Sequence, residues 1–226
     1  AWAFGLLGIE DYLRPLEGVS SVQSLRKEMA ERLLDLFRKV SSYEWPWFED
    51  RVTYCSARLS QALIASGPWM GNEEMRTAGL RSLEWLAEIQ CSEDGYFAPI
   101  GSNGFYERGG PRASFDQQPV EACAMVSACL EAQRATGDER WATRARRAFG
   151  WFQGQNHLQR SLYDATTGGC RDGLHADRAN ENQGAESTLS FLLALLEMRS
   201  ADRTGADSER RRNGATTRSN AREITI

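Results

Sequence analysis

The sequence predicts an all-α protein made of helical hairpins, and three observations support this prediction. Glu121 and Glu186 each open an apolar run, and they lie 65 positions apart. Trp85 and Trp151 repeat at nearly the same spacing. Apolar helices alternate with amphipathic ones, as a ring of buried helices inside a ring of half-exposed helices requires. The predicted fold class is therefore a partial, six-hairpin-like α/α toroid with a repeat of about 65 residues.

Two helices are expected before the first loop. The first covers residues 2–17 and ends at the proline and glycine break of residues 15–18. The second covers residues 20–40, because a serine can cap its start and its apolar residues recur every three or four positions. Pro46 keeps residues 43–50 from being helical.

The next hairpin combines an apolar helix with an amphipathic one. The apolar helix is expected over residues 53–65, and Gly67 and Pro68 are expected to end it. The amphipathic helix covers residues 73–90, and a glycine-rich loop of residues 91–115 follows it.

The fifth helix is expected over residues 116–135, and its stretch from Val120 to Leu130 is almost wholly apolar, which is typical of a buried helix. Gly137 is expected to end it, and Asp138 is expected to cap the sixth helix. A second long loop covers residues 155–182, and the seventh helix covers residues 183–198. Both long loops are expected at one end of the ring, just before inner helices. Long ordered loops in compact domains are usually functional, so we expect the functional site at that end.

The composition narrows the classes of partner. A formal net charge of −4 and a pI near 5.4 argue against nucleic acid and against an anionic membrane. No apolar stretch reaches the roughly 18–20 residues that span a bilayer. No basic leader precedes the first apolar residues, so we expect no signal peptide. The chain lacks an initiator Met, so we expect a fragment of a longer polypeptide.

The expected domain division falls near residue 200. Residues 1–200 form the toroid domain, and residues 201–226 form a polar tail that has few apolar residues to bury and is expected to be disordered. A basic interaction arm around Arg210 is the less favoured interpretation of the tail. Seven helices are too few for a closed ring of six hairpins, so the toroid is expected to be partial or open.

The cysteines and histidines predict no metal site. Five cysteines without a CxxC pair indicate free, mostly buried thiols in a reducing compartment, and hence a cytoplasmic protein. His175 lies between Asp172 and Asp177, and such a set could bind a metal or move a proton. With two histidines and no ligand spacing in the chain, we expect no metal and no cofactor.

Four sequence blocks resemble a known family. The blocks are Trp45 to Asp50, Phe115 to Ala122, Gly168 to Leu174 and Asn180 to Ser187. They resemble the α/α-toroid region found C-terminal to bacterial group 1 glycosyltransferases, and the resemblance covers roughly residues 1–198. It implies a fold similar to six-hairpin glycosidases and N-acylglucosamine 2-epimerases, a carbohydrate-related function and an attached transferase domain. It transfers no catalytic residue, and the nucleotide-sugar-binding domains are absent from this sequence.

Acidic residues are the candidate catalytic groups. Glu121 and Glu186 open successive inner helices, where both would face one funnel, and Asp50 and Asp116 are further candidates. Two carboxyl groups on either side of a sugar suffice for glycosidic acid/base chemistry. The structural alternative is that both glutamates bond to neighbouring helix N-termini, where negative charge is favoured.

Aromatic and amide residues are the candidate saccharide-binding groups. Rings can cover the C–H faces of sugars, and amides and carboxylates can bond to hydroxyls, whereas the structural alternative is that the same side chains anchor loops. The candidates are Trp45, Trp47, Tyr54, Asn103, Gln117, Asp172, His175, Asn182 and Gln183.

Three functional hypotheses follow. The first is an enzyme that processes a saccharide, and the second is a non-catalytic module that holds a glycan for an attached glycosyltransferase domain. The third is a structural scaffold with no open pocket at the long-loop end. The expected partners are a saccharide and a glycosyltransferase domain, with neither nucleic acid nor membrane.

Overall fold

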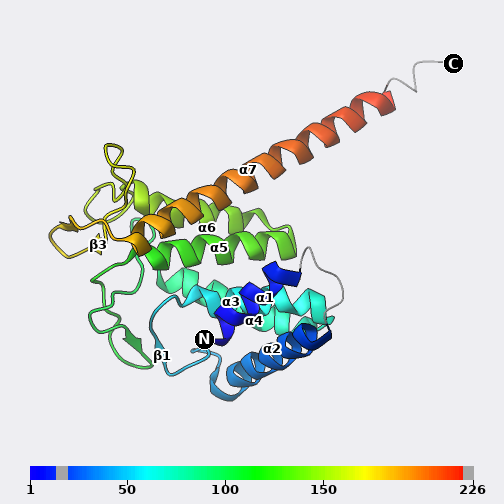
Figure 1. Ribbon diagram of the computed structural model, residues 1–226, viewed down its shortest axis with the longest axis horizontal. Coiled ribbons are helices and arrows are strands. Elements are labelled where there is room, and N and C mark those ends of the chain that lie inside the picture. Colours follow the sequence, from blue (N-terminus) through cyan, green and yellow to red (C-terminus); the bar gives the residue numbers. More distant parts are fainter. Residues whose placement is uncertain (14–19, 221–226) are drawn as a thin grey trace.

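The computed structural model describes residues 1–13 and 20–220, and its regular elements are mainly helices joined by long loops (Figure 1). The helices are α1 Trp2–Leu13, α2 Ser20–Val40, α3 Ala57–Met70, α4 Glu73–Ile89, α5 Pro119–Thr136, α6 Glu139–Gly150 and α7 Ala185–Asn220, with a 3-10 helix at Trp151–Gln153. The strands are β1 Arg51–Val52, β2 Tyr106–Glu107, β3 Gly173–Leu174 and β4 Ala179–Asn180. The predicted all-α class is confirmed.

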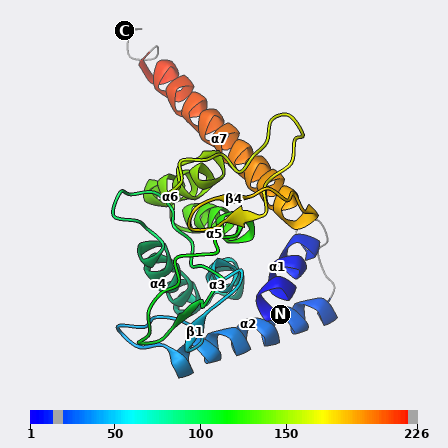
Figure 2. The same cartoon turned by 90° about the vertical axis from the view of Figure 1, so that its left-hand side faces the viewer.

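The helices form an open arc of inner and outer layers (Figure 2). Helices α3 and α5 lie in the centre and pack against each other, with α4 against α3 and α6 against α5 on one side. Helix α7 packs against α5 on the other side, where α1 packs against α3. Outer and inner helices therefore alternate along the chain, as the repeat predicts.

Helix α5 is buried along nearly its whole length because its sequence offers no polar face. Residues 121–130 are all buried, including Ala122, Met125 and Leu130. Gly137, with φ of 71°, ends the helix, and the side chain of Asp138 accepts a hydrogen bond from the backbone N–H of Arg140 at the start of α6. The predicted stop and restart between these two helices is confirmed.

Helix α3 differs from its predicted bounds. It begins at Ala57, four residues later than expected, and continues through Pro68 to Met70. Gly71 ends it in the left-handed conformation, and its backbone N–H bonds to the carbonyl groups of the last turn. The prediction that Gly67 and Pro68 end this helix is wrong, because a proline near a helix end removes only one backbone donor and keeps a helical φ.

Helix α7 is only half covered within the described part of the chain. Phe191, Ala194 and Met198 face the core, whereas the opposite face carries exposed leucines. These are Leu189, Leu192, Leu193 and Leu196, and each is between 40% and 62% exposed. The expectation that this inner helix is enclosed on all sides is therefore corrected.

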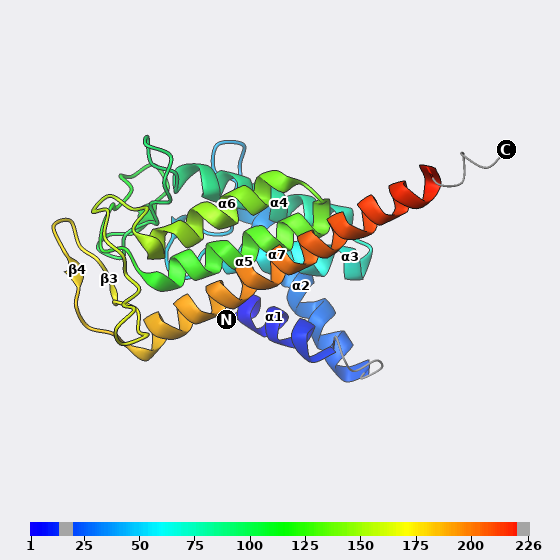
Figure 3. The same cartoon turned by 90° about the horizontal axis from the view of Figure 1, so that it is seen from above.

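The same helix also changes the expected tail. Figure 3 shows α7 continuing beyond the body of the molecule, and it is helical as far as Asn220. Residues 201–220 are therefore helical where the composition predicted disorder. The domain division at residue 200 stays a prediction, and residues 221–226, like the predicted end of the first helix at residues 14–17, lie outside the described residues.

The environment of the cysteines agrees with the prediction of free thiols. All five are free, and Cys55, Cys123, Cys129 and Cys170 are buried. None of the helices in the described ranges is both long enough and apolar enough to cross a bilayer. The cytoplasmic location stays a prediction.

Candidate functional site

The two long loops meet at the end of the molecule where α3, α5 and α7 begin. Strands β1 and β2 pair antiparallel there, as do β3 and β4. Gln117 and Leu174 exchange two backbone hydrogen bonds of 2.9 Å, which join the segment before α5 to the β3–β4 hairpin. We call this region the loop end (Figure 1). It holds most of the candidate residues in one place.

Glu121 faces inwards, so its expected orientation towards an open funnel is corrected. Its carboxylate accepts hydrogen bonds from the backbone N–H groups of Cys55 at 2.5 Å and Ser56 at 3.4 Å, just before α3. Burial raises the pKa of Glu121 to about 7, although these two bonds act in the opposite direction. The carboxylate is thus committed to a helix start, which matches the structural alternative, and we assign it no catalytic role.

Glu186 is exposed and bonds to Tyr54. The hydroxyl of Tyr54 donates to Glu186 Oε1 at 2.6 Å, and the Tyr54 side chain is itself 46% exposed. Burial and the nearby Glu186 carboxylate raise the pKa of Tyr54, so the hydroxyl remains a donor at neutral pH. The Tyr54–Glu186 pair joins the start of α7 to the segment before α3.

Asp116 and His175 form a second pair. His175 Nδ1 is hydrogen-bonded to Asp116 Oδ1 at 2.5 Å, and the two side chains are 28% and 42% exposed. The backbone carbonyl of Asp116 accepts from the N–H of Ser102 at 2.9 Å, and the N–H of His175 donates to the carbonyl of Arg178 at the same distance. Both members are therefore held by their backbones and still reach solvent.

The amide candidates mostly belong to the framework. Buried Gln117 accepts from Trp151 Nε1 at 2.8 Å and donates to the carbonyl of Ser114. Gln183 bonds to Thr167 and Asp164. These contacts match the structural alternative, in which the amides tie loops to helices.

Asp172 has a similar structural role at the start of α7. It accepts hydrogen bonds from the backbone of Gly184 and from the side chain of Asn182. Burial acts to raise the pKa of Asp172, but its bonds with Ser187, Gly184 and Asn182 outweigh burial and lower it. Asn182 and Asn103 remain exposed at the loop end.

Trp45 and Trp47 do not form a sugar platform, which corrects the expectation for this loop. Their side chains are only 4% and 1% exposed. Trp45 packs edge-on against Trp85 at 4.9 Å between ring centroids and donates from Nε1 to the carbonyl of Glu49. The loop folds under itself against α4, so its rings complete the core.

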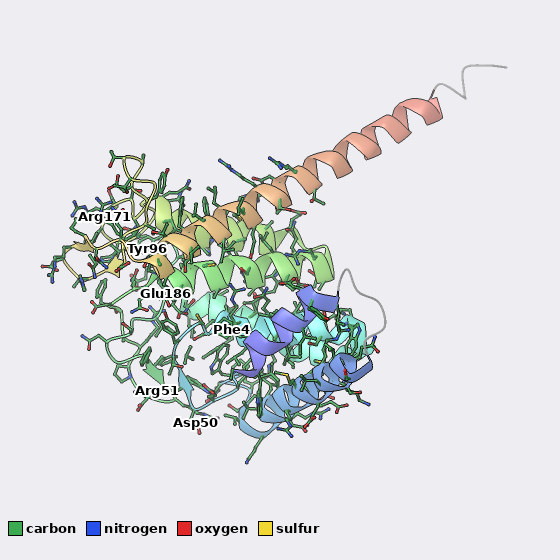
Figure 4. The ribbon with its side chains drawn as sticks, viewed as in Figure 1. Phe4, Asp50, Arg51, Tyr96, Arg171 and Glu186 are labelled. Atoms are coloured by element: carbon green, nitrogen blue, oxygen red, sulfur yellow. The ribbon has the colours of Figure 1, made fainter. Side chains whose placement is uncertain are left out.

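Asp50 lies outside the candidate site. It is exposed and forms an ion pair of 3.4 Å with Arg108 beside the β1–β2 sheet. Figure 4 shows Asp50 well separated from Glu186. Asp50 is therefore not grouped with Glu186, and its candidacy as a catalytic group stays a prediction.

The loop end also contains a cavity that sequence analysis missed. A hollow of about 540 Å³ adjoins a second of about 340 Å³, and Asp94, Tyr96 and His157 line both. We call the two together the loop-end cavity. These residues come from the two long loops, and the lengths of those loops were the one sequence signal that pointed to them.

Comparisons with known proteins give matches among solved structures. No model of a known protein family matches the chain, and no curated protein sequence matches it. Among solved structures, the chain is similar to a GH76 α-mannanase of Bacteroides thetaiotaomicron, with a TM-score of 0.63 and 12% sequence identity. The match covers 89% of this chain and 52% of the mannanase chain, so the chain spans about half the length of that enzyme. The chain thus shares its helical α/α-toroid fold with this enzyme.

Proposed function

We propose that the loop end binds a saccharide through the Asp116–His175 and Tyr54–Glu186 pairs. The observation that carries the proposal is that two partly exposed carboxylates, each oriented by one hydrogen bond, lie beside the starts of successive inner helices. Carboxylate oxygens accept from sugar hydroxyls, and tyrosine and histidine can both donate and accept. Small-ligand sites typically combine a few such fixed polar groups with a preformed hollow.

The similar α-mannanase supports α-linked mannose as the first saccharide to test. From the resemblance to the glycosyltransferase-associated region, we further propose that the site holds the saccharide for an attached transferase domain. A glycan-holding module and a saccharide-processing enzyme would both have to bind a saccharide at this site, so binding is the function to test first.

Hydrolysis is the second candidate function. The exposed Asp116 and Glu186 are its candidate catalytic carboxyl groups, in preference to the buried Glu121. One carboxyl group would protonate the leaving glycosidic oxygen, and the other would act as the base or the nucleophile. The mechanism requires the two groups to stand about 5–5.5 Å or about 6.5–9.5 Å apart around the bound sugar. The Asp116–His175 hydrogen bond provides a route by which the aspartate can gain or lose a proton.

Isothermal titration calorimetry with α-linked manno-oligosaccharides of one to four units tests the proposal. Replacing Asp116 with Asn or Glu186 with Gln is expected to weaken binding by about tenfold to a hundredfold, because each loses one charged hydrogen bond. Asp50→Asn is the matched control, since Asp50 is an exposed carboxylate that pairs with Arg108 and belongs to neither proposed pair, and the variant should bind as the wild type does. A wild type that binds none of these saccharides, or a control that loses as much affinity, would contradict the proposal. A reducing-sugar assay on the same mixtures separates hydrolysis from binding alone.

A further inference from the structure

The loop-end cavity is bounded by three chain segments that are far apart in the sequence. Residues 92–99 follow α4, residues 112–117 precede α5, and residues 154–159 follow the 3-10 helix. Figure 4 shows Tyr96 at the same end of the molecule as Glu186. The cavity is therefore part of the loop end and not a hollow elsewhere on the surface.

The first wall is a tight turn that fixes Tyr96. The N–H of Ser92 donates to the carbonyl of Tyr96 at 2.9 Å, and the N–H of Tyr96 donates back to Ser92 Oγ at 3.0 Å. The N–H of Gly95 also bonds to the carbonyl of Ser92. The ring of Tyr96 is thus presented from an ordered backbone and is partly exposed to the cavity.

The second wall is organised by Asn156, which is 2% exposed and bonds at both ends of its amide. Its Nδ2 donates to the carbonyl groups of Trp151 and Arg160, and its Oδ1 accepts from the N–H groups of Leu158 and Arg160. The neighbouring His157 ring packs on Phe115 with 4.4 Å between centroids. Both walls are ordered without a ligand, so binding pays a smaller entropic cost for ordering the site.

The chemistry of the lining fits an uncharged, hydroxyl-rich ligand. Asp94, Gln155 and Gln159 offer acceptors and donors, and the Tyr96 ring offers a flat apolar face. Glu93 and Asp94 outnumber the one arginine, Arg112, so an anionic ligand would meet net repulsion. Burial lowers the pKa of His157 and keeps its ring neutral near pH 7, although the carbonyl groups of Ala176 and His175 oppose this.

The cavity lies next to the Asp116–His175 pair, because consecutive residues of one segment belong to both. Phe115 and Gln117 line the cavity, and Asp116 between them bonds to His175. We propose that the loop-end cavity binds an uncharged sugar unit beyond the unit held by Asp116 and His175, so that the ligand is an oligosaccharide and not a single sugar. This inference rests on the proposed function and assigns Tyr96 as a contact for the added unit.

Chain-length dependence of binding tests the inference. Calorimetry with α-linked mannotetraose and with mannose is performed on the wild type, Tyr96→Ala and Tyr96→Phe. We expect Tyr96→Ala to weaken mannotetraose binding by about tenfold and to leave mannose binding unchanged, whereas Tyr96→Phe keeps the ring and the affinity. Tyr43→Ala is the matched control, because Tyr43 is 92% exposed on the loop before β1 and lines neither hollow.

The outcomes separate this inference from the proposed function. If Asp116→Asn weakens binding of both sugars but Tyr96→Ala changes neither, the cavity holds no sugar unit and the inference is overturned while the site stands. If the wild type binds neither sugar, both proposals are overturned. Thermal unfolding followed by circular dichroism verifies that each variant is folded before its affinity is compared.

Discussion

Replacing Glu121 with Ala should lower the free energy of unfolding by about 2–4 kcal/mol at pH 5, because two buried backbone N–H groups lose their acceptor. Those donors belong to Cys55 and Ser56 at the start of α3, and the vacated space lies among the core side chains of α5. Urea unfolding measures the change. Glu186→Ala is the matched control one repeat later. Because Glu186 is exposed, its replacement should lower the free energy of unfolding by no more than about 0.5 kcal/mol. Equal effects at the two positions would contradict the assigned role of Glu121.

The pH dependence of stability gives a second measurement on the same residue. The pKa of Glu121 is about 7 in the folded protein and 4.5 in the unfolded chain. Between these two pH values the folded state therefore holds a proton that the unfolded state has released. Stability therefore falls as pH rises from 4.5 to 7, by about 3 kcal/mol in total, and is level above this range. Glu121→Gln cannot ionise, so its stability relative to the wild type should rise by that amount over the same interval. A constant difference between the two proteins would rule out the buried, proton-binding carboxyl.

Local sequence signals predicted the parts of the fold that depend on local physics. The apolar run of α5 identifies a buried helix, because a chain without a polar face has to be enclosed. Gly137 and Asp138 identify the next hairpin, because one adopts a left-handed conformation and the other accepts from a free N–H. The end of α3 was predicted wrongly because Pro68 is tolerated in the last turn, and the left-handed residue that ends the helix is Gly71.

The candidate site was predicted less well, because exposure depends on contacts between distant residues. Trp45 and Trp47 have the composition of a sugar-binding loop, but Trp85 of α4 and Tyr106 enclose Trp45. Asp116 and His175 were singled out separately, and the bridge between Gln117 and Leu174, which lie far apart in the sequence, places them side by side. Tyr96 and His157 come from different repeats, and no spacing in the sequence indicates that they line one cavity.

Gly101→Ala is expected to disrupt the site, because Gly101 lies directly against the backbone of Phe115. A methyl group at this position would overlap the N, C and O atoms of Phe115, and backbone atoms cannot move aside as the end of a side chain can. The surrounding contacts are close as well, since Gly101 N–H donates to the carbonyl of Ala113 at 2.8 Å and Ser102 N–H donates to that of Asp116. Relief of the overlap has to move the segment that carries Asp116.

We therefore expect Gly101→Ala to lower the free energy of unfolding by about 3 kcal/mol, since an added methyl group forces the backbone to shift. Saccharide binding should weaken by more than about tenfold, because displacing Asp116 breaks the geometry of its pair with His175. Gly110→Ala is the matched control in the same loop, where the nearest atom to an added methyl group is the Glu107 carbonyl oxygen at an ordinary 3.4 Å. Thermal unfolding and calorimetry are measured on both variants. If the two behave alike, Gly101 does not support Asp116, whereas a loss confined to Gly101→Ala ties the position of Asp116 to the one residue small enough to lie beneath it.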